Sequence, residues 1–177
     1  FSPAIMGLYT QARKLEEIAS TSISSVVNQV AYPVLSEFQN DNLSMIRVLQ
    51  RFITSLAFLV FPLMMLLILI AKPLIILLYS DKWVASVPYF QILCIAGMAI
   101  CLQMINYNAV AAIGRSDILL KWTIIKRSLG LILNIGGLIC FGMYGLLWGG
   151  VLTAYSLYFI NSYLVSRYVG YRIKSQI

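Results

Sequence analysis

Long apolar runs separated by short polar connections dominate the chain. No charged residue occurs at 52–71, at 83–114, or between Arg127 and Arg167. A helix needs about 20 mainly apolar residues to cross the hydrocarbon core of a bilayer, so the last of these stretches has room for two crossings. A glycine-rich turn around Gly142 and Gly145 divides it. The pattern predicts an integral membrane protein.

The apolar runs are continuous and do not alternate with period two, which favours helices over a barrel. We therefore predict an all-α, polytopic helical membrane protein with about five transmembrane helices. Pro33 and Pro62 lie inside the first two helices and predict bends. Because the chain begins with Phe1, we expect it to be an internal part of a longer protein. The predicted helices cover residues 6–38, 45–79, 85–113, 117–141 and 144–168.

Composition and charge agree with a membrane location. Hydrophobic residues make up 60% of the chain and charged residues 11%, with a net charge of +7. The basic residues lie in the connections rather than among aromatics on a soluble face, so we predict topogenic charge and no nucleic-acid partner. The opposite side holds Arg13, Lys14, Lys72 and Lys82. The set predicted to be cytoplasmic is larger and comprises Arg47, Arg51, Arg115, Lys121, Lys126, Arg127, Arg167, Arg172 and Lys174.

Few residues offer catalytic or metal-binding chemistry. The chain has no histidine and no CxxC pair, so we predict no metal, no cofactor and no histidine-dependent nucleophile. Cys94, Cys101 and Cys140 lie in apolar helices and are predicted to be small packing residues. Solvated or capping roles are expected for Glu37, Asp41, Asp81 and Asp117, which leaves Glu16 and Glu17 inside a predicted helix.

The first predicted helix is unusually polar. Two readings of Arg13 and Lys14 remain open. They face a cavity inside the membrane, or they lie at the membrane interface and pair with Glu16 and Glu17. Its apolar side consists of Ile23, Val26, Val27, Val30 and Val34, at helical spacing. A polar stripe on another side consists of Thr10, Arg13, Glu17, Thr21, Ser24 and Asn28.

Four stretches together resemble a known family: MGLYTQARKL, SVVNQVAYPVLSEFQND, FPLMMLLILIAKPLIILLYSDKW and the GRSD connection at 114–117. They are similar to the carboxy-terminal lobe of Wzx-like flippases for lipid-linked oligosaccharides, of the multidrug/oligosaccharidyl-lipid/polysaccharide exporter superfamily. The resemblance implies that residues 1–177 form part of a six-helix lobe in a two-lobe exporter, without the amino-terminal lobe. It also implies alternating access across the inner (plasma) membrane for cell-surface polysaccharide biosynthesis.

The resemblance implies a binding site on the first helix. Arg13 matches a cationic residue that faces the cavity in the related lipid II flippases and meets the substrate diphosphate, with Lys14 as the neighbouring candidate. The implied partners are the lipid-linked oligosaccharide, membrane lipids and the polysaccharide assembly machinery. Further substrate-binding candidates are Glu17, Ser24, Asn28 and Gln29, with Gln103 and Asn106 as additional sugar contacts.

Other functions stay open at this point. An ion-coupled multidrug antiporter of the same superfamily would prefer acidic and aromatic residues in its cavity. A membrane-embedded glycan-modifying enzyme would need a catalytic cluster or a large extramembrane loop, and this stretch has neither. A purely structural membrane subunit is the remaining alternative. The resemblance therefore implies a flippase rather than an enzyme.

Overall fold

The computed structural model describes residues 3–39, 41–114 and 116–168. These residues form helices and no strand, which confirms the all-helical fold. The basic positions Arg115, Arg172 and Lys174 lie outside the described residues. In chain order the elements are α1 (Pro3–Glu37), α2 (Asn42–Leu69), α3 (Ala71–Tyr79), the 3₁₀ helix η1 (Asp81–Ser86), α4 (Val87–Ala112) and α5 (Ser116–Tyr168).

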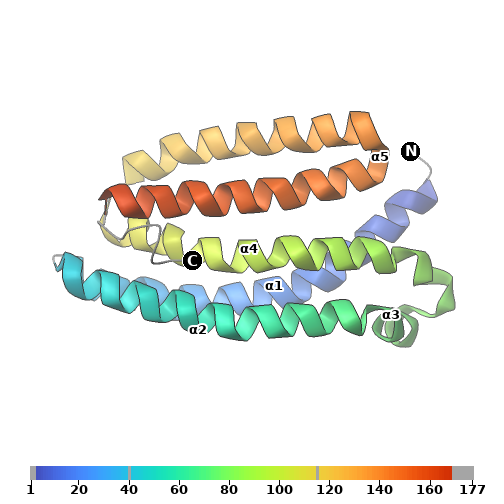
Figure 1. The fold of residues 1–177 in the computed structure, drawn as a ribbon, viewed down its shortest axis with the longest axis horizontal. Helices are drawn as coiled ribbons and strands as arrows, with labels where there is room; N and C mark the ends of the chain where they lie inside the picture. Colours follow the sequence, from blue (N-terminus) through green and yellow to red (C-terminus); the bar gives the residue numbers. More distant parts are fainter. Residues whose placement is uncertain (1–2, 40, 115, 169–177) are drawn as a thin grey trace.

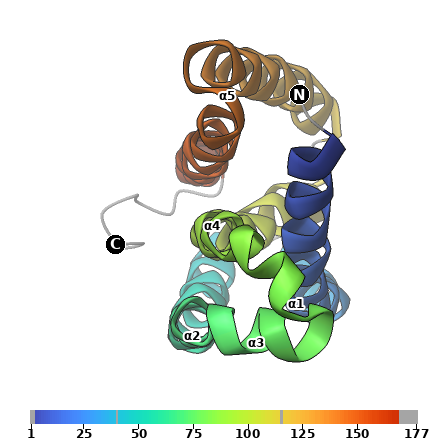
Figure 2. The ribbon, with the colours of Figure 1, turned by 90° about the vertical axis from the view of Figure 1, so that its right-hand side faces the viewer.

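Helix α4 is the central element. It packs against α1 and α2 on one side and against α5 on the other, as Figures 1 and 2 show. Most of its span is buried, whereas only a small share of the strongly apolar α2 and α5 spans is buried. Phe58 and Phe141, for example, are 83% and 79% exposed. Such surfaces are stable when they face lipid or another apolar protein surface.

Helix α5 is a hairpin rather than one rod. Gly142 has φ 61° and ψ −139°, a conformation that favours glycine, and the chain reverses there (Figure 1). The two halves come very close, because a Cβ built on Gly145 would lie 1.9 Å from the Gly137 carbonyl oxygen. Only glycines allow this approach. The turn that the sequence analysis placed around Gly142 is thus the hinge of the hairpin.

The predicted single helix at 45–79 is wrong, because the structure has two helices there. Helix α2 ends at Leu69, and Ile70 leaves the helical conformation with φ −91° and ψ 9°. Pro73 explains the break, since it has no N–H to donate to the Leu69 carbonyl and its ring would clash with that carbonyl. Helices α1 and α2 continue through Pro33 and Pro62.

The connection between α1 and α2 is fixed by Asp41. Its side chain accepts hydrogen bonds from the backbone N–H groups of Leu43 and Ser44, at 3.1 and 3.2 Å. Hydrogen bonds from the hydroxyl and backbone of Ser44 lower the pKa of the Asp41 carboxyl below its ordinary value. The expected capping role of Asp41 is confirmed.

Among the described residues, three helices are long and apolar enough to cross a membrane: Leu43–Leu69, Asp81–Ala112 and Leu119–Arg167. The last of these contains the reversal at Gly142, so it is long enough to pass twice. The protein is a multi-pass membrane protein. Helix α1 is too polar to qualify as a membrane-spanning helix by its composition. It nevertheless packs along α4.

Candidate functional site

The polar stripe on α1 holds an ion pair. Arg13 Nε donates to Glu17 Oε1 at 2.8 Å, one helical turn apart, and both side chains are about half exposed. Only Nε is used in this contact, so both terminal nitrogens of the guanidinium remain available. Lys14 is exposed and is rotated about 100° around the helix from Arg13. The structure therefore joins Arg13 to Glu17 and leaves Lys14 apart.

Two further members of the stripe, Ser24 and Asn28, face α4. Ser24 is buried, and Asn28 accepts a hydrogen bond of 2.7 Å from Nδ2 of Asn108 on α4. Gln29 is exposed and lies outside this contact. On α4 itself, Gln103 is half-buried and Asn106 is fully buried. The candidate sugar contacts are thus divided between the helix interface and the surface.

The buried face of α1 differs from the apolar side that the sequence predicts. From Ala12 to Ser24 it consists of small or polar residues four apart, whereas Val26 and Val30 are 62% and 47% exposed. Small residues let two helices approach closely, so they rather than the valines occupy the contact with α4. This face consists of Ala12, Glu16, Ser20, Ser24, Ala31 and Leu35.

Glu16 is the residue that sequence reasoning missed. It is 2% exposed, and its Oε1 has no hydrogen-bond partner. The carboxyl fits against α4 because Gly97 has no side chain: a Cβ there would lie 2.8 Å from Glu16 Oε1. The repeat Ala12, Glu16, Ser20 was the available signal for this face.

The contact between Glu16 and Gly97 also gives the depth of the ion pair. Gly97 lies ten residues after the start of α4 at Val87, which is about 15 Å along the axis. Arg13 precedes Glu16 by less than one turn, so it lies beside the α4 helix rather than beyond its end.

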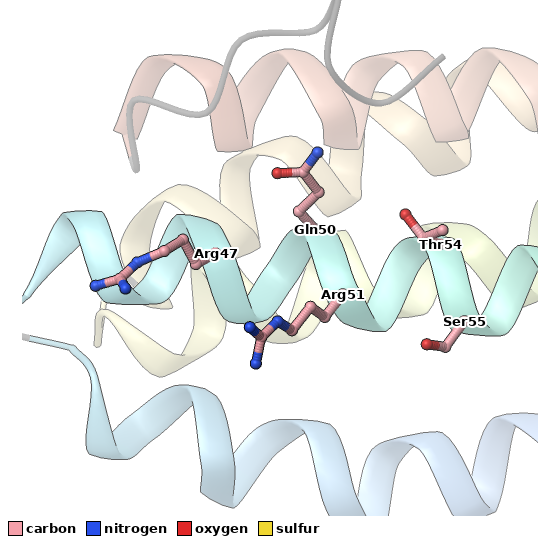
Figure 3. Close-up of a pocket in the computed structure, with 5 residues that line it drawn as sticks. All are labelled: Arg47, Gln50, Arg51, Thr54 and Ser55. Atoms are coloured by element: carbon pink, nitrogen blue, oxygen red, sulfur yellow. The ribbon is translucent and has the colours of Figure 1, made fainter.

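A second polar surface runs along α2 (Figure 3). Its pocket has a volume of about 450 Å³, and all five side chains are exposed. Arg47 Nη2 donates to the Ser44 hydroxyl at 3.0 Å. The sequence analysis treated Arg47 and Arg51 as topogenic charges only, although the helical spacing of their polar neighbours was visible. The pocket is lined by Arg47, Gln50, Arg51, Thr54 and Ser55.

Comparison with known proteins finds similarity to proteins of polysaccharide biosynthesis. Residues 1–88 match the family described as "Polysaccharide biosynthesis protein". The teichuronic acid biosynthesis protein TuaB of Bacillus subtilis is 27% identical over 117 residues, which cover 66% of this chain and 24% of TuaB. The lipopolysaccharide biosynthesis protein WzxC of Escherichia coli is 22% identical over 125 residues, covering 71% of this chain and 25% of WzxC.

A membrane protein of Klebsiella pneumoniae, described as uncharacterized and lying in the cps region, is 32% identical over 77 residues. These residues cover 44% of this chain and 16% of that protein. No solved structure matches the chain. The fold is that of a multi-pass membrane protein, and two of these relatives are named for polysaccharide biosynthesis. The first 88 residues are thus similar to that family, and the chain spans about a quarter or less of the length of these relatives.

Proposed function

We propose that the full-length protein is a flippase. It moves a lipid-diphosphate-linked oligosaccharide across the inner (plasma) membrane by alternating access, for cell-surface polysaccharide biosynthesis. In this proposal the described helices belong to the carboxy-terminal lobe of a two-lobe exporter. The relatives TuaB and WzxC, named for teichuronic acid and lipopolysaccharide biosynthesis, support a polysaccharide-related substrate.

The observation that carries the proposal is the Arg13–Glu17 ion pair beside the central helix. Glu16 points into α4, so Glu17 is the carboxylate that contacts Arg13, and it does so through Nε alone. Glu17 thereby orients the guanidinium and leaves both terminal nitrogens for a ligand. A planar guanidinium binds phosphate oxygens through paired, charge-assisted hydrogen bonds. Arg13 is therefore suited to hold a diphosphate.

The remaining candidates lie on the same helix as Arg13. Lys14 is exposed next to Arg13 and is the alternative cation. Ser24 and Asn28 lie further along α1 against α4, and Gln29 is exposed beside them. These polar groups are therefore on the carboxy-terminal side of Arg13, the residue proposed to bind the diphosphate. In the proposal they contact the sugars while the lipid tail stays in the bilayer. Assembly proteins would receive the glycan on the outer side.

The test is reconstitution of the full-length protein in liposomes that contain a polyprenyl-diphosphate oligosaccharide. We expect protein-dependent movement of the glycan between leaflets, measured as its exposure to a membrane-impermeant sugar oxidant. A polyprenyl-monophosphate analogue is the control and should move more slowly. The lipid-linked oligosaccharide recovered afterwards should have an unchanged mass. A changed mass would favour an enzyme, and equal movement in protein-free liposomes would reject the flippase.

A further inference from the structure

The α5 hairpin contains a polar pocket that the proposed substrate site does not use. It has a volume of about 490 Å³, within the usual range for small-molecule sites. The polar and small positions of its first half recur every three or four residues and so share one face of the helix. Its lining includes Thr123, Lys126, Arg127, Gly130, Asn134 and, from the second half of the hairpin, Thr153.

Lys126 is the buried cation of this pocket. Its side chain is only 8% exposed, and its ammonium donates a hydrogen bond to Oδ1 of Asn161 on the other half of the hairpin. An ammonium has three N–H donors, so this contact leaves two for a further acceptor. Arg127 follows immediately and is exposed. One buried and one exposed cation therefore line the same pocket.

These two cations lack an acidic counterpart. The sequence contains no Asp or Glu after Asp117, while Lys121, Lys126, Arg127 and Arg167 all lie in α5. In the part of the chain that the structure describes, the salt bridge is that between Arg13 and Glu17, far from this hairpin in sequence. A buried charge is costly unless it is paired. The pocket thus has room for an anion, and a bound anion would offset the cost of burying the Lys126 charge.

The surroundings indicate that the anion is attached to an apolar group. Ile124, Ile125 and Leu131 are 61%, 50% and 63% exposed on the same half of the hairpin, and Leu131 also lines the pocket. Lys126 lies ten residues after Ser116, about 15 Å from the start of the helix. A ligand at this place meets two cations and an apolar surface at once. Basic pockets between membrane helices bind lipid phosphates in this way.

We propose that the α5 pocket binds the phosphate of a lipid headgroup. Lys126 and Arg127 donate charge-assisted hydrogen bonds to its oxygens, and the lipid tail lies along Leu131 and the neighbouring isoleucines. Two sources share this chemistry: a resident anionic phospholipid, and the lipid-diphosphate that the transporter carries. The pocket does not include Arg13. The phospholipid source is independent of the proposed function, whereas the lipid-diphosphate source rests on it.

The experiment is native mass spectrometry of the full-length protein in neutral detergent. Phosphatidylglycerol is compared with phosphatidylcholine of the same acyl chains, and polyprenyl diphosphate and inorganic diphosphate are added as competitors. We expect the protein to bind the anionic phospholipid or the polyprenyl diphosphate about tenfold more tightly than phosphatidylcholine. Arg127→Gln, an exposed position, should remove most of this preference. Lys121→Gln, the same charge change on the same helix outside the pocket, should retain it.

The competitors distinguish the sources. Phosphatidylglycerol that stays bound when polyprenyl diphosphate is added identifies a resident phospholipid. Phosphatidylglycerol that is displaced by polyprenyl diphosphate but not by inorganic diphosphate identifies the lipid-diphosphate as the ligand. Equal displacement by inorganic diphosphate would overturn the requirement for a lipid. Equal binding of phosphatidylglycerol, polyprenyl diphosphate and phosphatidylcholine, or an Arg127→Gln variant that binds as wild type does, would overturn the site itself.

Discussion

The carboxyl of Glu16 on α1 occupies the space that Gly97 leaves on α4, where a Cβ would lie 2.8 Å from Oε1 and 3.3 Å from the Met64 methyl group. A buried carboxyl is thus enclosed by the packing of three helices, with α2 contributing Met64. Because Glu16 Oε1 and the Met64 methyl group both lie so close, a side chain at position 97 would require one of them to move. This contact fixes the register of α1 on the central helix.

Gly97→Ala should therefore destabilise the protein by about 1–3 kcal/mol through overpacking. The measurement is reversible unfolding of the full-length protein in mixed micelles. Gly136→Ala is the matched control, because no atom lies within 4 Å of a Cβ at this helical glycine. If the carboxyl is the obstacle, Glu16→Ala should offset part of the loss in the double variant. Equal stability of Gly97→Ala and wild type would contradict the close packing.

The hydrogen bond between Asn28 and Asn108 predicts a measurable coupling between α1 and α4. Such bonds between membrane helices contribute about 0.6 kcal/mol on average, up to about 1.7. A double-mutant cycle with Asn28→Ala and Asn108→Ala should give a coupling energy in this range from unfolding free energies. Gln29→Ala serves as the control, since Gln29 is exposed on the same helix. Strict additivity of the two asparagine variants would mean that the bond does not contribute.

Sequence reasoning found the membrane class, the helical fold and the reversal at Gly142, because these depend on local signals: charge-free length and glycine. It placed Arg13 and Glu17 on one stripe, since residues four apart share a helix face. It did not find that Glu16 is the buried carboxyl, because that depends on which face α4 covers. Helix packing through small residues overrides the usual rule that valines are inside.

The same limit applies to Lys126. Its position near a helix end indicated topogenic charge, and periodicity within one helix says nothing of Asn161, which the hairpin brings to it from 35 residues away. The break at Ile70 could have been predicted from the sequence, because Pro73 has no N–H to donate to the Leu69 carbonyl.

The hairpin glycines should be intolerant of any side chain. Gly145→Ala places a Cβ 1.9 Å from the backbone oxygen of Gly137, so the two halves must separate. We expect a loss of about 3 kcal/mol or more in the unfolding free energy, since two backbones rather than flexible side chains must move. Gly136→Ala is again the control. Normal stability of Gly145→Ala would show that the halves are further apart than in this structure.

Orientation can be tested by thiol labelling. In a Cys140→Ser background, which removes the exposed native thiol, a cysteine at Gln39 should react with an impermeant maleimide only after the inner face is opened. A cysteine at Ser80 should react from outside. Both positions are exposed and lie in connections at opposite ends of α2 and α3. The reverse labelling would overturn the orientation derived from the basic residues.

The proposed role of Arg13 predicts a graded loss of transport. In the full-length protein, Arg13→Ala should reduce glycan export at least about tenfold at equal protein abundance, because it removes a half-exposed ligand rather than a packing side chain. Arg13→Lys should recover only part of the activity, since lysine keeps the charge and loses the paired donors. Glu17→Gln should impair export less, because it loosens the orientation of the guanidinium and keeps its charge. Lys14→Ala is the control on the adjacent position and should export normally. Wild-type export by Arg13→Ala would remove Arg13 from the site, and a loss confined to Lys14→Ala would move the diphosphate contact to the neighbouring face of α1.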